Sequence, residues 1–197
     1  FRNVKKNDQV YLRGFGYENY TSRSDWTRGF HSAGIGADWK ESLTHPGEWF
    51  AYFEAYGETL PAYTNTVSLS KDKKDKWGIP QPVISMEYGE NEKKMRADMQ
   101  QSAVAMLEAA KMDWVNAFDY GLFPGTVIHE MGTARMGNDP KTSLLNKWNQ
   151  AHDIRNLFVT DGSCMVSSPC QNPSLTYMAL TARACDHAVQ ELKKGNI

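Results

Sequence analysis

The sequence is poor in the features that mark several large classes of protein. Its 197 residues include three cysteines, Cys164, Cys170 and Cys185, which form neither a CxxC pair nor a recognisable disulfide framework. No apolar run approaches the roughly 20 residues that a membrane-spanning helix needs. Lysine and arginine total 22 against 23 acidic residues, and no basic block marks a nucleic-acid binder. We therefore expect no membrane span, no nucleic-acid partner and, from the cysteines, a reducing compartment.

A glycine-rich phosphate loop is also missing. The stretch LRGFGYEN (residues 12–19) has Asn19 at the third glycine position and no helix pattern after it. The stretch GIGADW (34–39) fails in the same way, with Trp39 at that position. The chain therefore carries no recognisable dinucleotide fingerprint.

A zinc site of the HExxH type is excluded on similar grounds. His129 and Glu130 begin that pattern, but Thr133 stands at the second ligand position and the next histidine is His152. Zinc hydrolases of this kind need two histidines one helical turn apart. We therefore expect no metal site.

What is present describes a globular protein of one or two domains. Apolar residues make up 41% of the chain and are spread along it. The first residue is Phe1, and we expect the chain to be a piece of a longer one. Aromatic residues are dense in the first 60 positions, which favours a packed core over a sugar-stacking surface.

The first 120 residues predict strands followed by one long helix. Strand patterns occupy QVYLRGF (9–15), EWFAYFEAYGE (48–58), NTVSLS (65–70) and PVISMEY (82–88). The last two predict an antiparallel pair joined by the long polar stretch 71–81. Five residues at helical spacing predict a helix over 91–111 with a buried face, namely Met95, Met99, Ala103, Met106 and Ala110.

The last part of the chain predicts two short strands and a helix. Strand patterns occupy GTVIHEMGT (125–133) and NLFVTDGS (156–163). Asn172 stands at the expected N-cap and Pro173 at the first helical position, while Lys193, Lys194 and Gly195 mark the helix end. The expected buried face consists of Leu175, Ala179, Ala182, Val189 and Leu192.

The residues alone leave the role of two side chains open. His129 is either a satisfied structural histidine or a general base. Asn172 is either a helix cap or a group that binds substrate. Composition and spacing do not decide between these alternatives.

Three ordered motifs carry a resemblance that bears on this choice. HEMGTARMG, NLFVTDGS and NPSLTYMALTARACDHAV, in this order and spacing, resemble the C-terminal signature of the glucose–methanol–choline (GMC) family of flavin oxidoreductases. The stretch 58–86 resembles that family's substrate-domain hairpin. The resemblance covers roughly residues 55–192, and it is strongest to bacterial sugar, sugar-acid and polyol dehydrogenases.

The resemblance implies a role for each motif residue. His129 corresponds to the family's active-site histidine, and Asn172 to a second active-site position that is histidine or asparagine in different members. Asp161 and Gly162 match a turn that approaches the flavin's ribityl and phosphate region. Three residues, Pro173, Ser174 and Thr176, fall where a helix start meets the isoalloxazine ring. Two loop positions depart from the pattern: Cys170, where glycine is common, and Val166, where proline is common.

The chemistry that the resemblance implies suits these residues. FAD is the implied cofactor, and the implied reaction oxidises a CH–OH group by moving a hydride to the flavin N5. A neutral His129 with a pKa near ~6.5 is suited to take the hydroxyl proton. Asn172 can donate an N–H to the substrate oxygen, and the start of the helix favours negative charge on the reduced flavin. If Asn172 binds substrate, Ser174 or water is left to satisfy the first turn of the helix.

The expected fold class is α+β. Residues 1–120 are expected to form part of an antiparallel-sheet substrate-binding domain with packed helices. Residues 121–197 are expected to rejoin an FAD-binding α/β domain as a strand and a helix. The expected partners are FAD, the substrate, the N-terminal remainder of a parent chain and another copy of this fragment.

Two functional hypotheses follow from different classes. The first is a segment of an FAD-dependent oxidoreductase, inactive alone, and the second is a non-catalytic binding or assembly domain of the same ancestry. The cysteines indicate the cytoplasm, whereas the sugar-acid dehydrogenase resemblance allows the periplasm.

Overall fold

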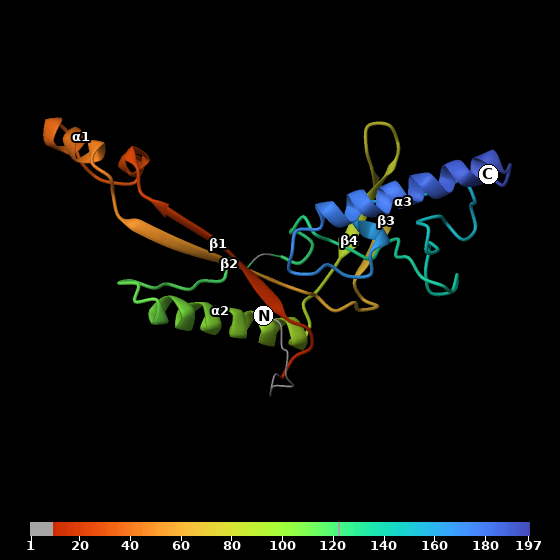
Figure 1. Cartoon of the computed structure of the whole chain (residues 1–197), viewed down its shortest axis with the longest axis horizontal. Coiled ribbons are helices and arrows are strands. Elements are labelled where there is room, and N and C mark those ends of the chain that lie inside the picture. The colour runs from red at the N-terminus through yellow and green to blue at the C-terminus, as the bar shows by residue number, and fades with distance from the viewer. Residues whose placement is uncertain (1–9, 122) are drawn as a thin grey trace. The chain divides into compact units, whose positions relative to one another are not determined.

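The computed structural model describes residues 10–121 and 123–197 and has a mixed α+β fold (Figure 1). The described α-helices are α1 (Ala37–Thr44), α2 (Glu90–Ala109) and α3 (Ser174–Lys193). The strands are β1 (Phe15–Arg23), β2 (Trp49–Gly57), β3 (Thr66–Lys74) and β4 (Pro80–Ser85), and the 3-10 helices are η1 (Trp26–Phe30) and η2 (Gly162–Cys164). The strands pair as β1–β2 and β3–β4, two small antiparallel sheets. The α+β prediction is confirmed at this level.

Contacts divide the chain into two compact units, which we describe separately. One unit spans residues 16–56, and the other contains residues 57–197 together with the described residues before Gly16. None of the helices in the described part of the chain is both long enough and apolar enough to cross a membrane.

The unit of residues 16–56 carries exposed aromatic side chains. Ring pairs cross the β1–β2 ribbon between Tyr17 and Phe53, with centroids 5.7 Å apart, and between Tyr20 and Tyr52, 6.3 Å apart. Trp26, Phe30 and Trp49 are nevertheless exposed, so the prediction of a well-packed aromatic core here is wrong. A two-stranded ribbon buries too little surface to enclose its own rings.

Two local predictions in this region need correction. The strand predicted over 9–15 is wrong, because residues 10–13 form bends and β1 starts at Phe15, where the prediction ended; residue 9 lies outside the described residues. The strand predicted over 48–58 is confirmed as β2. A helix, α1, does follow Gly36. The indole of Trp39 lies so close to Gly34 that a Cβ there would be 1.8 Å from its Cδ1 atom. Trp39, at the position of the missing third glycine, thus packs against Gly34.

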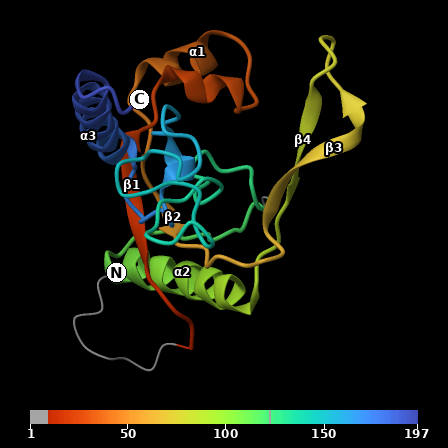
Figure 2. The same cartoon turned by 90° about the vertical axis from the view of Figure 1, so that its right-hand side faces the viewer.

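The β3–β4 hairpin confirms the predicted antiparallel pair, with Val67 opposite Ile84 and Leu69 opposite Pro82. Its connection is shorter than predicted, because the strands continue to Lys74 and start again at Pro80. One carboxylate oxygen of Asp75 accepts hydrogen bonds from the amides of residues 77 and 79, at 2.8 and 2.9 Å, and this fixes the tight turn. The hairpin extends away from the rest of its unit (Figure 2).

Helix α2 confirms the predicted helix but only part of its predicted buried face, because Ala103 and Met106 are half-buried and Ala110, beyond the helix end, is exposed. Met95 and Met99 are buried, and both lie against Gly57 at the end of β2. At the start of the helix, the buried Glu92 carboxylate accepts hydrogen bonds from the amides of Gly89, at 2.9 Å, and Leu60, at 3.0 Å. These contacts attach the helix to the chain that precedes it.

The two strands predicted near the C-terminus are wrong. Residues 125–133 contain no strand: Gly125, residues 128–129 and Thr133 lie in turns, and positive φ at Gly125 (82°) and Gly132 (93°) interrupts an extended run. In the 156–163 stretch, pairing is limited to an isolated bridge from Phe158 to Gln150. The partner segment bends at Asn149, whose φ is 62°, so a longer ladder does not form.

Helix α3 has the predicted end but a different start and buried face. It ends at Lys193, followed by Gly195 with φ of 72°, as expected for a glycine after a helix. It begins at Ser174 with Pro173 at the N-cap, so the prediction of Asn172 as the N-cap is wrong. The predicted buried face is also wrong, because Leu175 and Leu192 are 79% and 64% exposed while Leu180 and Ala184 pack inward.

Candidate functional site

The predicted site residues lie on three segments of the larger unit. His129 is half-buried in a turn. Asp161 and Gly162 begin η2. The remaining predicted residues, Asn172, Pro173, Ser174 and Thr176, lie at the start of α3, where all except the proline are exposed.

Backbone hydrogen bonds join the segment after His129 to η2. The amide of Ala134 donates to the carbonyl of Ser163, at 3.0 Å, and the amide of Met136 donates to the carbonyl of Cys164, at 2.8 Å. These bonds connect positions almost 30 residues apart in the sequence, so they bring the first two motifs together.

The third motif meets the other two at Gly162. A Cβ atom on this glycine would be 2.8 Å from the Tyr177 hydroxyl, 3.1 Å from the Glu130 carbonyl and 3.1 Å from the Met131 sulfur. The Tyr177 hydroxyl also lies 3.6 Å from that sulfur, in the geometry of a weak hydrogen bond. Burial raises the pKa of Tyr177, so its hydroxyl stays protonated and can donate. Glycine at position 162 therefore allows three segments to meet.

Asp161 has a clear local role in this arrangement. One of its carboxylate oxygens accepts from the amide of Ser163, at 2.8 Å, and also from the hydroxyl of the same residue. The side chain thereby caps η2 and fixes the turn that presents Gly162.

A buried polar side chain, that of Asn149, holds the segment that leads into this turn. Asn149 is fully buried, donates to the carbonyl of Val159 at 3.0 Å and accepts from the Arg183 guanidinium at 3.2 Å. Cys164 is also fully buried, and burial raises the pKa of its thiol. The thiol therefore stays protonated and packs in the core with Ala134, Leu145 and Ala151 rather than acting as a nucleophile.

Sequence reasoning missed Tyr177, Asn149 and Arg183. In the sequence, Tyr177 precedes Leu180 by three residues and Ala184 by seven. This helical spacing indicates that Tyr177 lies on the inner face of α3. Asn149 gives a weaker signal, since asparagine tolerates positive φ better than most residues. Arg183 gives none, because an arginine in a helix normally lies in solvent.

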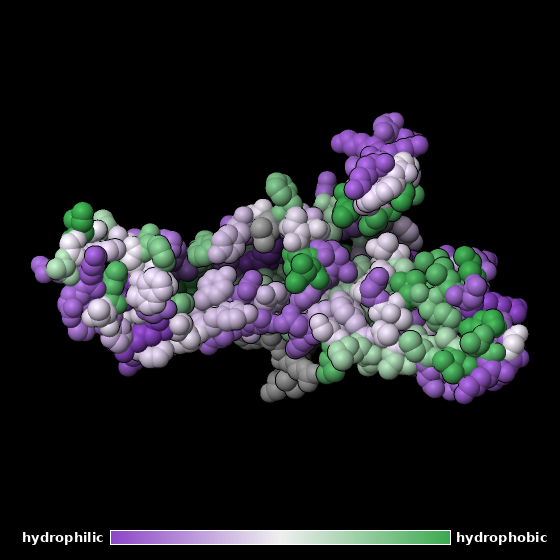
Figure 3. Space-filling model, turned by 90° about the horizontal axis from the view of Figure 1, so that it is seen from above, coloured by the Kyte–Doolittle hydropathy of each residue, from purple (hydrophilic) through white to green (hydrophobic). Residues whose placement is uncertain are grey.

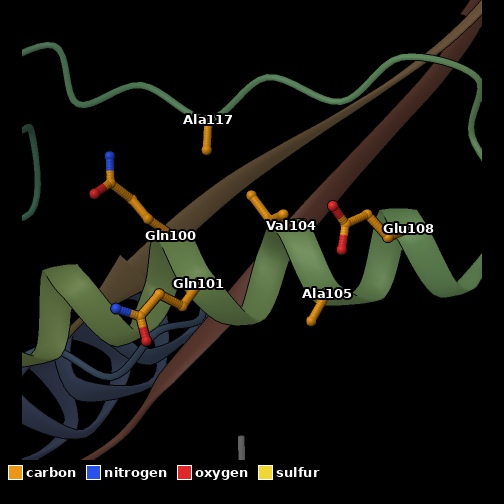
Figure 4. Close-up of a pocket in the computed structure, with 6 residues that line it drawn as sticks. All are labelled: Gln100, Gln101, Val104, Ala105, Glu108 and Ala117. Atoms are coloured by element: carbon orange, nitrogen blue, oxygen red, sulfur yellow. The ribbon is translucent and has the colours of Figure 1, made fainter.

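A groove elsewhere on the larger unit contains none of the predicted site residues. It lies between α2 and the chain that follows it, and Figure 4 shows its lining of Gln100, Gln101, Val104, Ala105, Glu108 and Ala117.

Within residues 10–121 and 123–197, no three or more histidine, cysteine, aspartate or glutamate side chains are grouped to hold a metal ion.

Comparison with known proteins gives a family and several relatives. Residues 61–181 match the sequence model of the family described as GMC oxidoreductase. Over 134 residues, 67% of the chain, it is 40% identical to 2-methyl-1,2-propanediol dehydrogenase of Mycolicibacterium austroafricanum, of which it covers 24%. It is also 36% identical over 70% of its length to the fructose dehydrogenase large subunit of Gluconobacter japonicus, of which it covers 25%.

A more distant relative is the gluconate 2-dehydrogenase flavoprotein of Pantoea cypripedii. The identity is 27% over 74% of the chain, and the match covers 25% of that protein. The chain thus spans about a quarter of the length of the curated relatives it matches.

Proposed function

The chain belongs to the GMC oxidoreductase family, and from this membership we propose that it is the C-terminal part of an FAD-dependent enzyme that oxidises alcohols. The proposed substrates contain a CH–OH group and are sugars, sugar acids or polyols, the classes that the names of the relatives include. The observation that carries the proposal is the meeting of the three motifs at Gly162.

The residues at this junction fit the cofactor that the family uses. Helix α3 is 20 residues long, and Asn172, Ser174 and Thr176 at its start are exposed. The first amides of a helix have no partner within it, and together with the helix dipole they favour a negatively charged group. Asp161, Gly162, Pro173, Ser174 and Thr176 would hold FAD at this end of the helix. When bound, FAD supplies the acceptor for the hydride.

The chain's own residues take up the proton and orient the substrate oxygen. We assign His129 as the base that takes the proton from the substrate hydroxyl, a step that contributes on the order of 10²–10⁴-fold. Asn172 donates an amide N–H to the same oxygen and orients it. His129 is half-buried, so part of this residue is open to solvent.

The proposed division of the chain follows the same assignment. Residues 1–120 belong to the substrate-binding domain, and residues 121–197 rejoin the FAD-binding domain of the parent protein. The core around Leu145 and Cys164 would then support the turn that carries Asp161 and Gly162.

The proposal is tested in the full-length parent enzyme with His129→Ala. We expect kcat to fall by about 10²–10⁴-fold while flavin remains bound. His152→Ala is the matched control, because its ring contacts the Ser143 hydroxyl, at 3.1 Å, in a loop outside the proposed site. Near-normal turnover of His129→Ala across the pH range would refute the assignment of His129 as the base.

A further inference from the structure

The junction at Gly162 places one side chain, Tyr177, between the two halves of the proposed site. Tyr177 is in the first turn of α3, and its amide donates to the carbonyl of Pro173 at 3.0 Å. Pro173 is buried and directly follows Asn172. The backbone of Tyr177 is therefore fixed relative to the chain that carries Asn172.

The same ring reaches the segment that carries His129. Its hydroxyl lies 3.6 Å from the Met131 sulfur, two residues beyond His129. The backbone bonds to η2 begin further along, at Ala134. Nearer to His129, the tyrosine hydroxyl and the methionine sulfur pack against Gly162.

We infer that Tyr177 is a positioning residue that sets the location of His129 relative to Asn172. It acts through Met131 and does not touch the reacting atoms. The contact is weak as a hydrogen bond, because a thioether is a poor acceptor, but sulfur also packs favourably against an aromatic ring. Its influence comes from location, since a displacement of about 1 Å in a catalytic group can cost on the order of 10²-fold in rate. The inference rests on the proposed function.

The junction at Gly162 is closely packed. Gly162 has no room for a methyl group, so the backbone of η2 is already in contact with Tyr177 and Met131. If the tyrosine hydroxyl is removed, the Met131 side chain can move into the vacated space, and His129 moves with its segment. Loss of the Met131 sulfur should have the same consequence, because the two groups form one contact.

The test uses the full-length parent holoenzyme with an artificial dye acceptor. The substrate is the best of 2-methyl-1,2-propanediol, fructose and gluconate, unlabelled and deuterated at the oxidised carbon. Tyr177→Phe, Met131→Leu and the double variant are compared with Tyr63→Phe, a control at a fully exposed tyrosine. The measurements are kcat, KM, the primary isotope effect and the flavin content of each purified protein.

We expect each single variant to lower kcat by about 3- to 30-fold, within the range that misplacement of a catalytic group can cause. KM and flavin content should stay within about twofold, and the isotope effect should rise as hydride transfer becomes slower. The double variant should be no slower than the worse single variant, because both substitutions remove the same contact. Tyr63→Phe should behave as the wild type.

Three results would overturn the inference. They are an unchanged kcat in Tyr177→Phe, additive losses in the double variant, or a fall in flavin content that parallels the fall in kcat. The last result would mean that Tyr177 only maintains the fold. His129→Ala measured alongside separates the two proposals. Lost turnover in that variant with a normal Tyr177→Phe refutes the role of Tyr177 alone, whereas normal turnover in His129→Ala refutes the assignment of His129 as the base, on which the role of Tyr177 rests.

Discussion

At the scale of single residues, Asn172 shows how a proline changes the start of a helix. Because α3 begins at Ser174 with Pro173 at its N-cap, Asn172 lies just outside the helix and is not its capping residue. A missing amide proton costs nothing at the start of a helix, where it has no intrahelical partner. Capping of α3 is therefore not the role of Asn172.

Asn172→Asp in the parent holoenzyme should impair oxidation. A carboxylate near the negative charge that the cofactor gains on reduction is unfavourable, and about 1.4 kcal/mol in the transition state already costs tenfold in rate. We expect kcat to fall by about tenfold or more and the flavin midpoint potential to become more negative. Asn172→His, a residue that some members of the family carry there, is the control and should keep most of the activity. Unchanged rate and potential in Asn172→Asp would contradict the assignment.

A second residue-scale prediction concerns the buried support of the site. Asn149→Ala removes the hydrogen bonds to Val159 and Arg183 and places alanine at a φ of 62°. Because Arg183 is exposed and water can replace its bond, the lost hydrogen bonds cost about 1 kcal/mol and a left-handed alanine costs about 1–2 kcal/mol, so we expect a loss of about 2–3 kcal/mol in the free energy of unfolding. Urea unfolding of the chain measures it. Asn149→Gly should lose about 1 kcal/mol less, and an Asn149→Ala variant as stable as the wild type would exclude this role.

At the scale of elements, α3 has apolar residues on two faces. One face packs inward through Leu180 and Ala184. The other carries an exposed stripe at spacings of three and four residues, namely Leu175, Met178, Ala182, Cys185, Val189 and Leu192. Figure 3 shows hydrophobic residues gathered where α3 lies at the surface. An exposed apolar stripe of this kind favours association.

We expect the isolated chain to self-associate through this stripe. The spacing matches a heptad pattern, and it reads similarly from both ends, with leucines outermost and the small Ala182 and Cys185 in the middle. Sedimentation of the wild type should show a concentration-dependent increase in mass, which Val189→Glu should reduce. Gln190→Glu makes the same change in charge off the stripe and should leave association intact. A monomeric wild type, or equal effects of both substitutions, would rule out the stripe as the interface.

Elements with a single clear hydrophobic pattern could be predicted from the sequence. Elements whose packing depends on residues distant in the sequence could not. Helix α2 was predicted because Met95 and Met99 repeat at helical spacing on one face of a polar sequence. The buried face of α3 was wrongly predicted because an apolar pattern on two faces does not show which of them the chain covers. The resemblance supplied the candidate residues, but the junction at Gly162 depends on Tyr177 and on long-range backbone bonds, which local patterns cannot reveal.

At the scale of the whole molecule, the chain holds the proposed base and substrate-orienting groups without a recognisable site for the phosphates of a dinucleotide. The one short helix that follows a glycine pair, α1, has Trp39 packed over Gly34. Tight binding of FAD in dinucleotide folds relies on a glycine-rich turn and an acidic residue for the ribose. Contacts at Asp161 and at the start of α3 reach only part of such a large cofactor.

We therefore expect the 197-residue chain to be colourless and inactive alone, although it contains both His129 and Asn172. The helix start and the turn at Gly162 supply a few amide groups and no phosphate cradle, so any flavin bound to them should exchange rapidly and be lost on desalting. The measurement is the visible spectrum of the purified chain after incubation with FAD and gel filtration, with the full-length parent as the positive control. Circular dichroism checks that α2 and α3 are folded in the same sample. Stoichiometric flavin retained by a folded chain would show that the Asp161 turn and the start of α3 are sufficient for binding, and it would contradict the proposed division at residue 120.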